Sequence, residues 1–181
     1  MKLLTTSESL DPLIGKSLAA EETRPRCVPH EDGALVIFRG VNTEPGASPE
    51  DMVSVRVWAD ATKVITYQQR RLEVVTQLAS EVEDNKGPKS PGDFLVSLAD
   101  RLTDRMQEVV DAIDSQLDEI EVRQSNGLVP PIREAITQVR RKIVVLRRFI
   151  APQRDALDVL VAEKFTGFIS DILLLKPGHW R

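Results

Sequence analysis

The chain has 181 residues, of which 41% are apolar and 29% are charged, and its formal net charge is −4. This balance is typical of one globular domain of moderate size and differs from the composition of disordered chains. An acidic chain lacks the basic surface that a nucleic-acid partner needs. The single cysteine, Cys27, excludes an internal disulfide framework. No stretch approaches the roughly eighteen uninterrupted apolar residues of a membrane helix.

Residues 1–90 predict a short helix, four strands and a second helix. The helix opens at Asp11-Pro12, where an N-cap residue precedes a proline, and runs to about Ala20. The strands form two hairpins, the first turning at Asp32-Gly33. The expected strands are Arg26 to Glu31, Ala34 to Val41, Met52 to Ala59 and Lys63 to Gln69, and the second helix covers Leu72 to Val82.

Two of these strands also predict how the sheet is buried. The run Leu35-Val36-Ile37-Phe38 is apolar on both faces, which favours a central strand. The third strand alternates, with its valines on one side and Ser54, Arg56 and Trp58 on the other.

Residues 91–164 predict two long helices that fold back on each other. Apolar residues of the first helix recur at steps of three or four and form one face, the first seam: Leu95, Leu98, Leu102, Met106, Val109, Ile113, Leu117 and Ile120. The second helix offers a second seam: Ile132, Ile136, Val139, Ile143, Leu146 and Ile150. Ser125-Asn126-Gly127 supplies the turn, Pro130-Pro131 restarts a helix, and Pro152 predicts a local end or kink.

The charges of the two long helices predict their register. Arg133, Arg140, Arg147 and Arg154 recur every seven residues beside the second seam. Folding the chain back about Gly127 sets Glu121 opposite Arg133, Asp114 opposite Arg140 and Asp100 opposite Arg154. Exposed ion pairs contribute about 0 to 1 kcal/mol each. We therefore expect them to select the register while the buried seams stabilise the hairpin.

The order of these elements predicts an α/β fold. A largely antiparallel or mixed sheet is layered between helices, in an α/β/α arrangement, and carries a long antiparallel helical hairpin.

One sector of the first long helix is acidic and lies opposite its seam. Its carboxylates are Asp104, Glu108, Asp111, Asp114, Asp118 and Glu121. Carboxylate oxygens suit hard cations, and like charges gathered on one face attract counter-ions. We take Asp104, Glu108, Asp111 and Asp118 as candidate metal-binding residues of a cation-attracting face. An ordinary solvated helix face explains the same residues.

Other chemistry is harder to assemble from this sequence. No GxxxxGK, GxGxxG or GxSxG motif is present, and the pattern predicts no enzyme. Cys27 and His30 form a Cys-x2-His pair, but structural zinc takes four ligands and no second such pair exists. A strand-end thiol and an exposed imidazole are the alternative. The basic run between Arg140 and Arg148 could bind nucleic acid or anionic lipid. No continuous basic face remains, however, because the heptad arginines flank the seam, so salt bridging and solubility are the favoured explanation.

Several stretches together resemble the CorA-type metal ion transporters, and within that family most resemble the ZntB zinc transporters. They are Glu22-Thr-Arg-Pro-Arg-Cys27, His30-Glu-Asp-Gly33, Leu35-Val-Ile-Phe-Arg-Gly-Val-Asn42, Pro49-Glu-Asp-Met-Val-Ser54, Val57-Trp58, and Arg147-Arg148 through Ala151-Pro-Gln-Arg154. The resemblance covers about Leu10 to Glu163. It implies an α/β/α cytoplasmic domain, a funnel-shaped homopentamer and transport of Zn²⁺ across the bacterial inner membrane.

On this resemblance, residues 1–181 are a partial cytoplasmic domain. Residues 1–90 form the sheet and its covering helices, 91–164 the long hairpin, and 165–181 a tail before a stalk helix that the chain lacks. The expected partners are identical subunits, the membrane domain and divalent cations, with no tightly bound cofactor and Zn²⁺ as the ion that is transported or sensed. The rivals are a scaffold or adaptor domain whose hairpin docks partner helices, and an enzyme whose site the sequence does not reveal.

Overall fold

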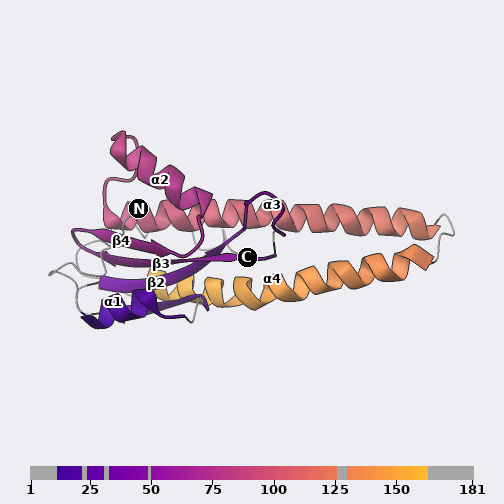
Figure 1. Ribbon diagram of the computed structural model, residues 1–181, viewed down its shortest axis with the longest axis horizontal. Coiled ribbons are helices and arrows are strands. Elements are labelled where there is room, and N and C mark those ends of the chain that lie inside the picture. Colours follow the sequence, from indigo (N-terminus) through magenta and orange to yellow (C-terminus); the bar gives the residue numbers. More distant parts are fainter. Residues whose placement is uncertain (1–11, 22–23, 31–32, 49, 126–129, 163–181) are drawn as a thin grey trace.

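The computed structural model describes residues 12–21, 24–30, 33–48, 50–125 and 130–162. They form helix α1 (Pro12–Ala19), strands β1 (Arg26–His30), β2 (Gly33–Gly40), β3 (Val53–Asp60) and β4 (Val64–Gln68), and helices α2 (Glu73–Glu83), α3 (Pro91–Ser125) and α4 (Pro130–Ala162). Figure 1 shows a sheet from which α3 and α4 project together as a long hairpin. The predicted helices and strands are present, and their ends differ from prediction by about two residues or fewer.

The sheet has the strand order β1-β2-β3-β4, and each neighbouring pair is antiparallel. Val57 of β3 lies opposite Val36 of β2 and Thr66 of β4. The inner strands β2 and β3 are buried along almost their whole length. The apolar run that begins at Leu35 is therefore central in the sheet, as predicted.

The two faces of the sheet are covered by different helices. Val55 and Val57 belong to the main core, which residues of α2, α3 and α4 complete. Trp58 points the other way and packs with Ile14 and Leu18 of α1. The predicted α/β/α layering is confirmed, because alternation along β3 supplies apolar side chains to both faces.

The start of α3 is fixed by local hydrogen bonds and by one ion pair. Ser90 Oγ accepts the backbone N–H of Asp93 at 3.0 Å, and Pro91 occupies the first helical position. Further along, the Arg101 guanidinium donates two hydrogen bonds, at 2.9 and 2.7 Å, to the carboxylate of Glu81 in α2. These bonds from Arg101 lower the pKa of Glu81 and hold α2 beside α3.

The first seam is confirmed. Its buried members are Leu95, Leu98, Leu102, Met106, Ile113 and Ile120, while Val109 and Leu117 are partly buried. Leu95, Leu98 and Leu102 join the core beneath the sheet, and the rest form a separate cluster along the hairpin.

The second seam is partly wrong. Val139 and Leu146 are buried as predicted, as is Ile132, but Ile136 is 45% exposed and Ile143 is 42% exposed. Ala135 and Phe149 pack into the hairpin cluster instead. The apolar residues of α4 span a wider arc than one seam, so their spacing allowed two adjacent faces. Only one of these faces meets α3.

The predicted ion-pair register is also wrong. Met106 lies opposite Gln153, which donates to its sulfur at 3.7 Å, whereas the predicted register would place Arg148 there. Lys142 donates to Gln116 Oε1 at 3.3 Å, and Arg154 pairs with its own neighbour Asp155. Within the described residues, no ion pair joins Asp114 to Arg140 or Glu121 to Arg133. The helices are displaced by about one turn because buried seam residues outweigh weak surface pairs.

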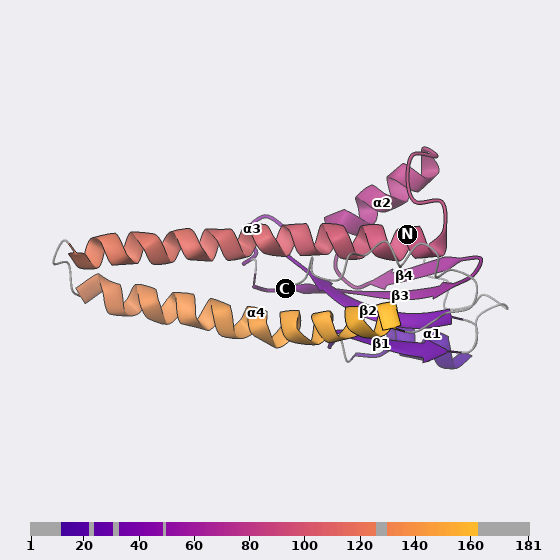
Figure 2. The same ribbon diagram turned by 180° about the vertical axis from the view of Figure 1, so that it is seen from behind.

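Helix α4 continues through Pro152 to Ala162, so the proline does not end it. Figure 2 shows the helix bowed along its length rather than straight. The predicted tail at 165–181 and the turn residues Asn126 and Gly127 lie outside the described residues.

Candidate functional site

The predicted cation-attracting residues lie on the exposed side of α3. Asp104, Glu108, Asp111 and Asp118 are all exposed and follow one stripe of the helix. Glu108 forms an ion pair with Arg105 at 3.1 Å, and Asp111 accepts a hydrogen bond from Gln107 at 2.7 Å. Two of the four carboxylates are therefore already engaged by neighbouring side chains.

These carboxylates do not converge on one point. Among the residues that the structure describes, no group of three or more His, Cys, Asp or Glu side chains is placed to hold a metal ion. A closed metal site needs such convergence, whereas a diffuse field does not. Attraction of cations to this face stays a prediction.

Cys27 and His30 are separated by the sheet. Cys27 packs against the main core on the side of α2, α3 and α4. The His30 ring instead meets Trp58 edge to face, with ring centroids 5.6 Å apart, and Trp58 packs against α1 on the other face. Residues three apart on a strand point to opposite faces, so this pair cannot bind one ion.

The structure brings forward two arginines that the sequence reasoning did not propose as functional. Arg39 Nη1 donates to the carbonyl of Met52 at 2.5 Å, and its guanidinium lies 4.5 Å from the centre of the Phe149 ring. Arg56 is fully buried in the centre of the sheet. The only signal in the sequence was an arginine within an alternating, otherwise largely apolar strand.

The buried guanidinium of Arg56 has hydrogen-bond donors that lack an acceptor among the described residues. Its Nη2 donates to the carbonyl of Ala20, and its guanidinium lies 5.0 Å from the Tyr67 ring centre, but Nε and Nη1 find no acceptor in the described part of the chain. Burial lowers the pKa of Arg56. The interaction with Tyr67 raises this pKa and the charge of Arg26 lowers it, so the pKa stays below its ordinary value.

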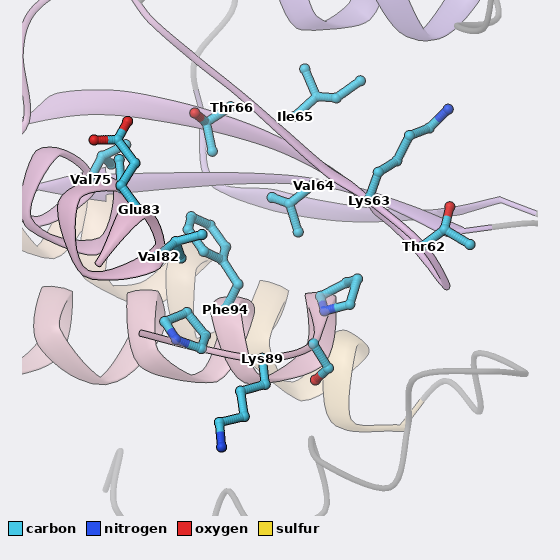
Figure 3. Close-up of a pocket in the computed structure, with 14 residues that line it drawn as sticks. Thr62, Lys63, Val64, Ile65, Thr66, Val75, Val82, Glu83, Lys89 and Phe94 are labelled. Carbon is cyan, nitrogen blue, oxygen red and sulfur yellow. The ribbon is translucent and has the colours of Figure 1, made fainter. Parts of the chain in front are cut away.

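An apolar cavity of about 550 Å³ lies between β4, α2 and the start of α3 (Figure 3). Val64, Val75, Val82 and Phe94 line it. Figure 3 shows Lys63 and Lys89 at its edges with their ammonium groups directed away. Thr66, Glu83 and Ser90 are among its polar lining residues, and none of the four carboxylates of the predicted cation face lines it.

The site's setting is therefore a four-stranded antiparallel sheet that carries a long helical hairpin, with exposed carboxylates along the outer side of α3. The sequence pattern of the family described as CorA-like Mg²⁺ transporter protein matches residues 1–174, and the chain belongs to this family. The family is one of ion transporters. Across the helices that the structure describes, none combines the length and apolar character needed to span a bilayer.

The chain is similar to several proteins of known type. It is 39% identical over 170 residues to the divalent cation transporter CmaX of Pseudomonas aeruginosa. The aligned region covers 93% of this chain and 51% of CmaX. The zinc transport protein ZntB of Cronobacter sakazakii is 29% identical over 168 residues, with 93% and 51% covered. The chain therefore spans about half the length of the curated relatives it matches.

Solved structures agree with this assignment. The full-length CmaX structure superposes with a TM-score of 0.84 over 93% of this chain and 52% of that chain, at 39% identity. The crystal structure of the ZntB cytoplasmic domain from Vibrio parahaemolyticus gives a TM-score of 0.77 at 25% identity, covering 96% and 67%. The resemblance seen in the sequence is confirmed.

Proposed function

We propose that this chain is the cytoplasmic regulatory and assembly domain of a longer divalent-cation transporter of the bacterial inner membrane. The observation that carries the proposal is the match to full-length CmaX, which aligns 93% of this chain with 52% of a divalent cation transporter. The similarity to the ZntB cytoplasmic domain supports the same place in the molecule. In this proposal the remaining half of the transporter supplies the membrane helices.

Zn²⁺ is the proposed ion, transported or sensed rather than held as a tightly bound cofactor. The similarity to ZntB supports zinc, while the name of CmaX specifies only a divalent cation. Transport in proteoliposomes prepared from the full-length reading frame tests the choice. We expect an internal zinc-sensitive dye to respond to external Zn²⁺. Entry of Mg²⁺ without entry of Zn²⁺, with a magnesium-sensitive dye in parallel liposomes, would refute zinc. A reading frame without two apolar runs of about twenty residues would refute transport.

Identical subunits are the proposed partners, arranged as a homopentamer. Ile136 and Ile143 support this because they expose an apolar strip on one flank of α4, seven residues apart. Native mass spectrometry of the full-length protein tests the number of subunits. A monomer whose hairpin captures another helical protein would instead favour the scaffold function.

The acidic stripe of α3 is proposed to attract divalent cations weakly. Exposed carboxylates that do not converge form no closed cage, and the Debye length of about 8 Å at physiological ionic strength screens them. We expect shallow calorimetric titration with zinc that a few hundred millimolar salt reduces. The test variant neutralises three carboxylates together: Asp104→Asn, Glu108→Gln and Asp111→Asn.

A matched control removes the same charge elsewhere. Neutralising Glu134, Asp155 and Asp158, which are exposed on α4, should leave most of the zinc heat in place, and Cys27→Ser should change little. An equal loss of the heat of zinc binding in both triple variants would show that net charge alone attracts the ion. One tight site lost in Cys27→Ser would overturn the placement of the site on α3.

A further inference from the structure

A second cavity, of about 700 Å³, lies between α4 and the ends of β1 and β2. Every charged side chain among its described lining residues is an arginine: Arg24, Arg39, Arg147 and Arg148. Apolar groups of α4, including Phe149 and Pro152, complete the wall. We call this feature the arginine cavity.

The fold gathers these arginines from three segments that are distant in the sequence. In the β1–β2 ladder Arg26 lies opposite Ile37, so the same antiparallel register brings Arg24 level with Arg39 just before β1 begins. Helix α4 passes beside β1 and β2 and adds Arg147 and Arg148. The cavity therefore exists only in the folded chain.

Two of the guanidinium groups lie over the same aromatic ring. Arg39 lies 4.5 Å and Arg148 lies 5.9 Å from the centre of the Phe149 ring. Arg39 is further fixed by its bond to the Met52 carbonyl, and its backbone N–H donates to Gln153 Oε1 at 2.7 Å. Fixed side chains lose less conformational entropy when a ligand binds.

The positive charge of the cavity is local and is not a property of the whole chain. The chain carries a net charge of −4, yet no carboxylate of the described residues lines this cavity. Glu21, Glu50 and Asp51 line an adjoining cavity, which shares Arg39 and Phe149 with this one.

The arginines also act on one another. Arg147 and Arg148 form no ion pair within the described part of the chain. Burial lowers the pKa of Arg39, and the charges of Arg56 and Arg148 lower it further. Like charges this close repel, and a bound anion would relieve that repulsion.

We propose that the arginine cavity binds the phosphate group of a small, multiply charged anion. A planar guanidinium presents paired N–H donors that match phosphate oxygens, and several guanidinium groups together match a charge greater than one. The volume falls within the roughly 300 to 1,000 Å³ of small-molecule sites. This proposal is independent of which cation the transporter carries.

Isothermal titration of the chain with inorganic pyrophosphate tests the proposal. We expect saturable binding with one pyrophosphate per chain. The double variant Arg147→Ala/Arg148→Ala should bind at least about tenfold more weakly, since hydrogen bonds between charged groups contribute roughly that much or more each. The matched control is Arg140→Ala/Arg141→Ala, which removes two exposed arginines of the same helix that do not line the cavity.

The outcomes separate the possible sources of the phosphate. Binding that the control keeps and the test variant loses supports the proposal with a soluble ligand. Binding to phosphatidylglycerol vesicles but not to pyrophosphate, with the same dependence on Arg147 and Arg148, supports it with a lipid headgroup. Equal weakening in both double variants, or no binding to either probe, would overturn it. The four substituted arginines, Arg140, Arg141, Arg147 and Arg148, are exposed, so unchanged unfolding midpoints should show that each variant folds.

Discussion

Substitutions on α4 test which of its two apolar faces stabilises the hairpin. Leu146 is only 4% exposed and packs in the hairpin cluster, whereas Ile143 is 42% exposed. The sequence pattern alone predicts a loss of about 2 to 5 kcal/mol for Ile143→Ala, as in a packed core. The structure predicts that Leu146→Ala is the costly change.

The expected magnitudes follow from burial. Leu146→Ala removes three buried carbon atoms at about 0.8 kcal/mol each, and a residual cavity brings the loss to about 2.5 to 4 kcal/mol. Ile143→Ala removes three atoms of a side chain that is 42% exposed, leaves no enclosed cavity, and gains roughly 0.4 kcal/mol of helix propensity. Its loss should be about 1 kcal/mol.

Urea unfolding of the chain and its variants measures these differences in the free energy of unfolding. Arg141→Ala is the control and should cost under about 0.5 kcal/mol, because this side chain is exposed. A loss for Ile143→Ala equal to or greater than that for Leu146→Ala would refute the observed face of α4.

Three further predictions concern the sheet and its junction with the hairpin. Gln153→Leu should lower the free energy of unfolding in urea by about 1 to 3 kcal/mol, because it leaves the partly buried backbone N–H of Arg39 without its acceptor. An unchanged midpoint would contradict this. Gly40→Ala should cost about 1 to 3 kcal/mol, since a new Cβ would lie 2.7 Å from Leu102 Cδ2 in a filled core; a stabilised variant would show that the core can shift. Burial raises the pKa of Asp60, but hydrogen bonds from the β3–β4 turn lower it more, to below its ordinary 3.8. The stability that ionised Asp60 contributes is therefore present above about pH 4 and is lost as the pH falls through its folded pKa. In Asp60→Asn, the free energy of unfolding should fall less steeply as the pH drops below about 4. An unchanged pH dependence would show that Asp60 does not contribute to acid sensitivity.

The sequence alone determined the order and type of the elements. Alternation in residues 53–59 and the three-to-four spacing from Leu95 to Ile120 are local patterns, and turn residues between them limit how the chain can fold back. The antiparallel sheet, its coverage on both faces and the helical hairpin follow from these patterns. Family membership was predicted from short motifs, such as Ala151-Pro-Gln-Arg154, which the family match confirms.

The sequence predicted the positions of the candidate cation-attracting carboxylates on one side of a helix, but not their ability to bind an ion. Helical periodicity placed Asp104, Glu108, Asp111 and Asp118 on one exposed side of α3, and the structure has them there. The same periodicity places Arg105 one turn from Glu108, and the structure shows that the two side chains form an ion pair. Attraction of cations to the stripe depends on the sum of weak, screened interactions along α3, which no single residue pattern encodes.

The tertiary structure decided which of several locally equivalent arrangements the chain adopts. The apolar residues of α4 allow two faces, and packing of Leu146 and Phe149 against α3 selects one of them. Exposed ion pairs are too weak to oppose that packing, so the predicted pairing of Asp114 with Arg140 is lost. The arginine cavity is likewise a product of tertiary structure, because Arg24, Arg39 and Arg148 meet only when a strand ladder and a helix more than a hundred residues away are packed together.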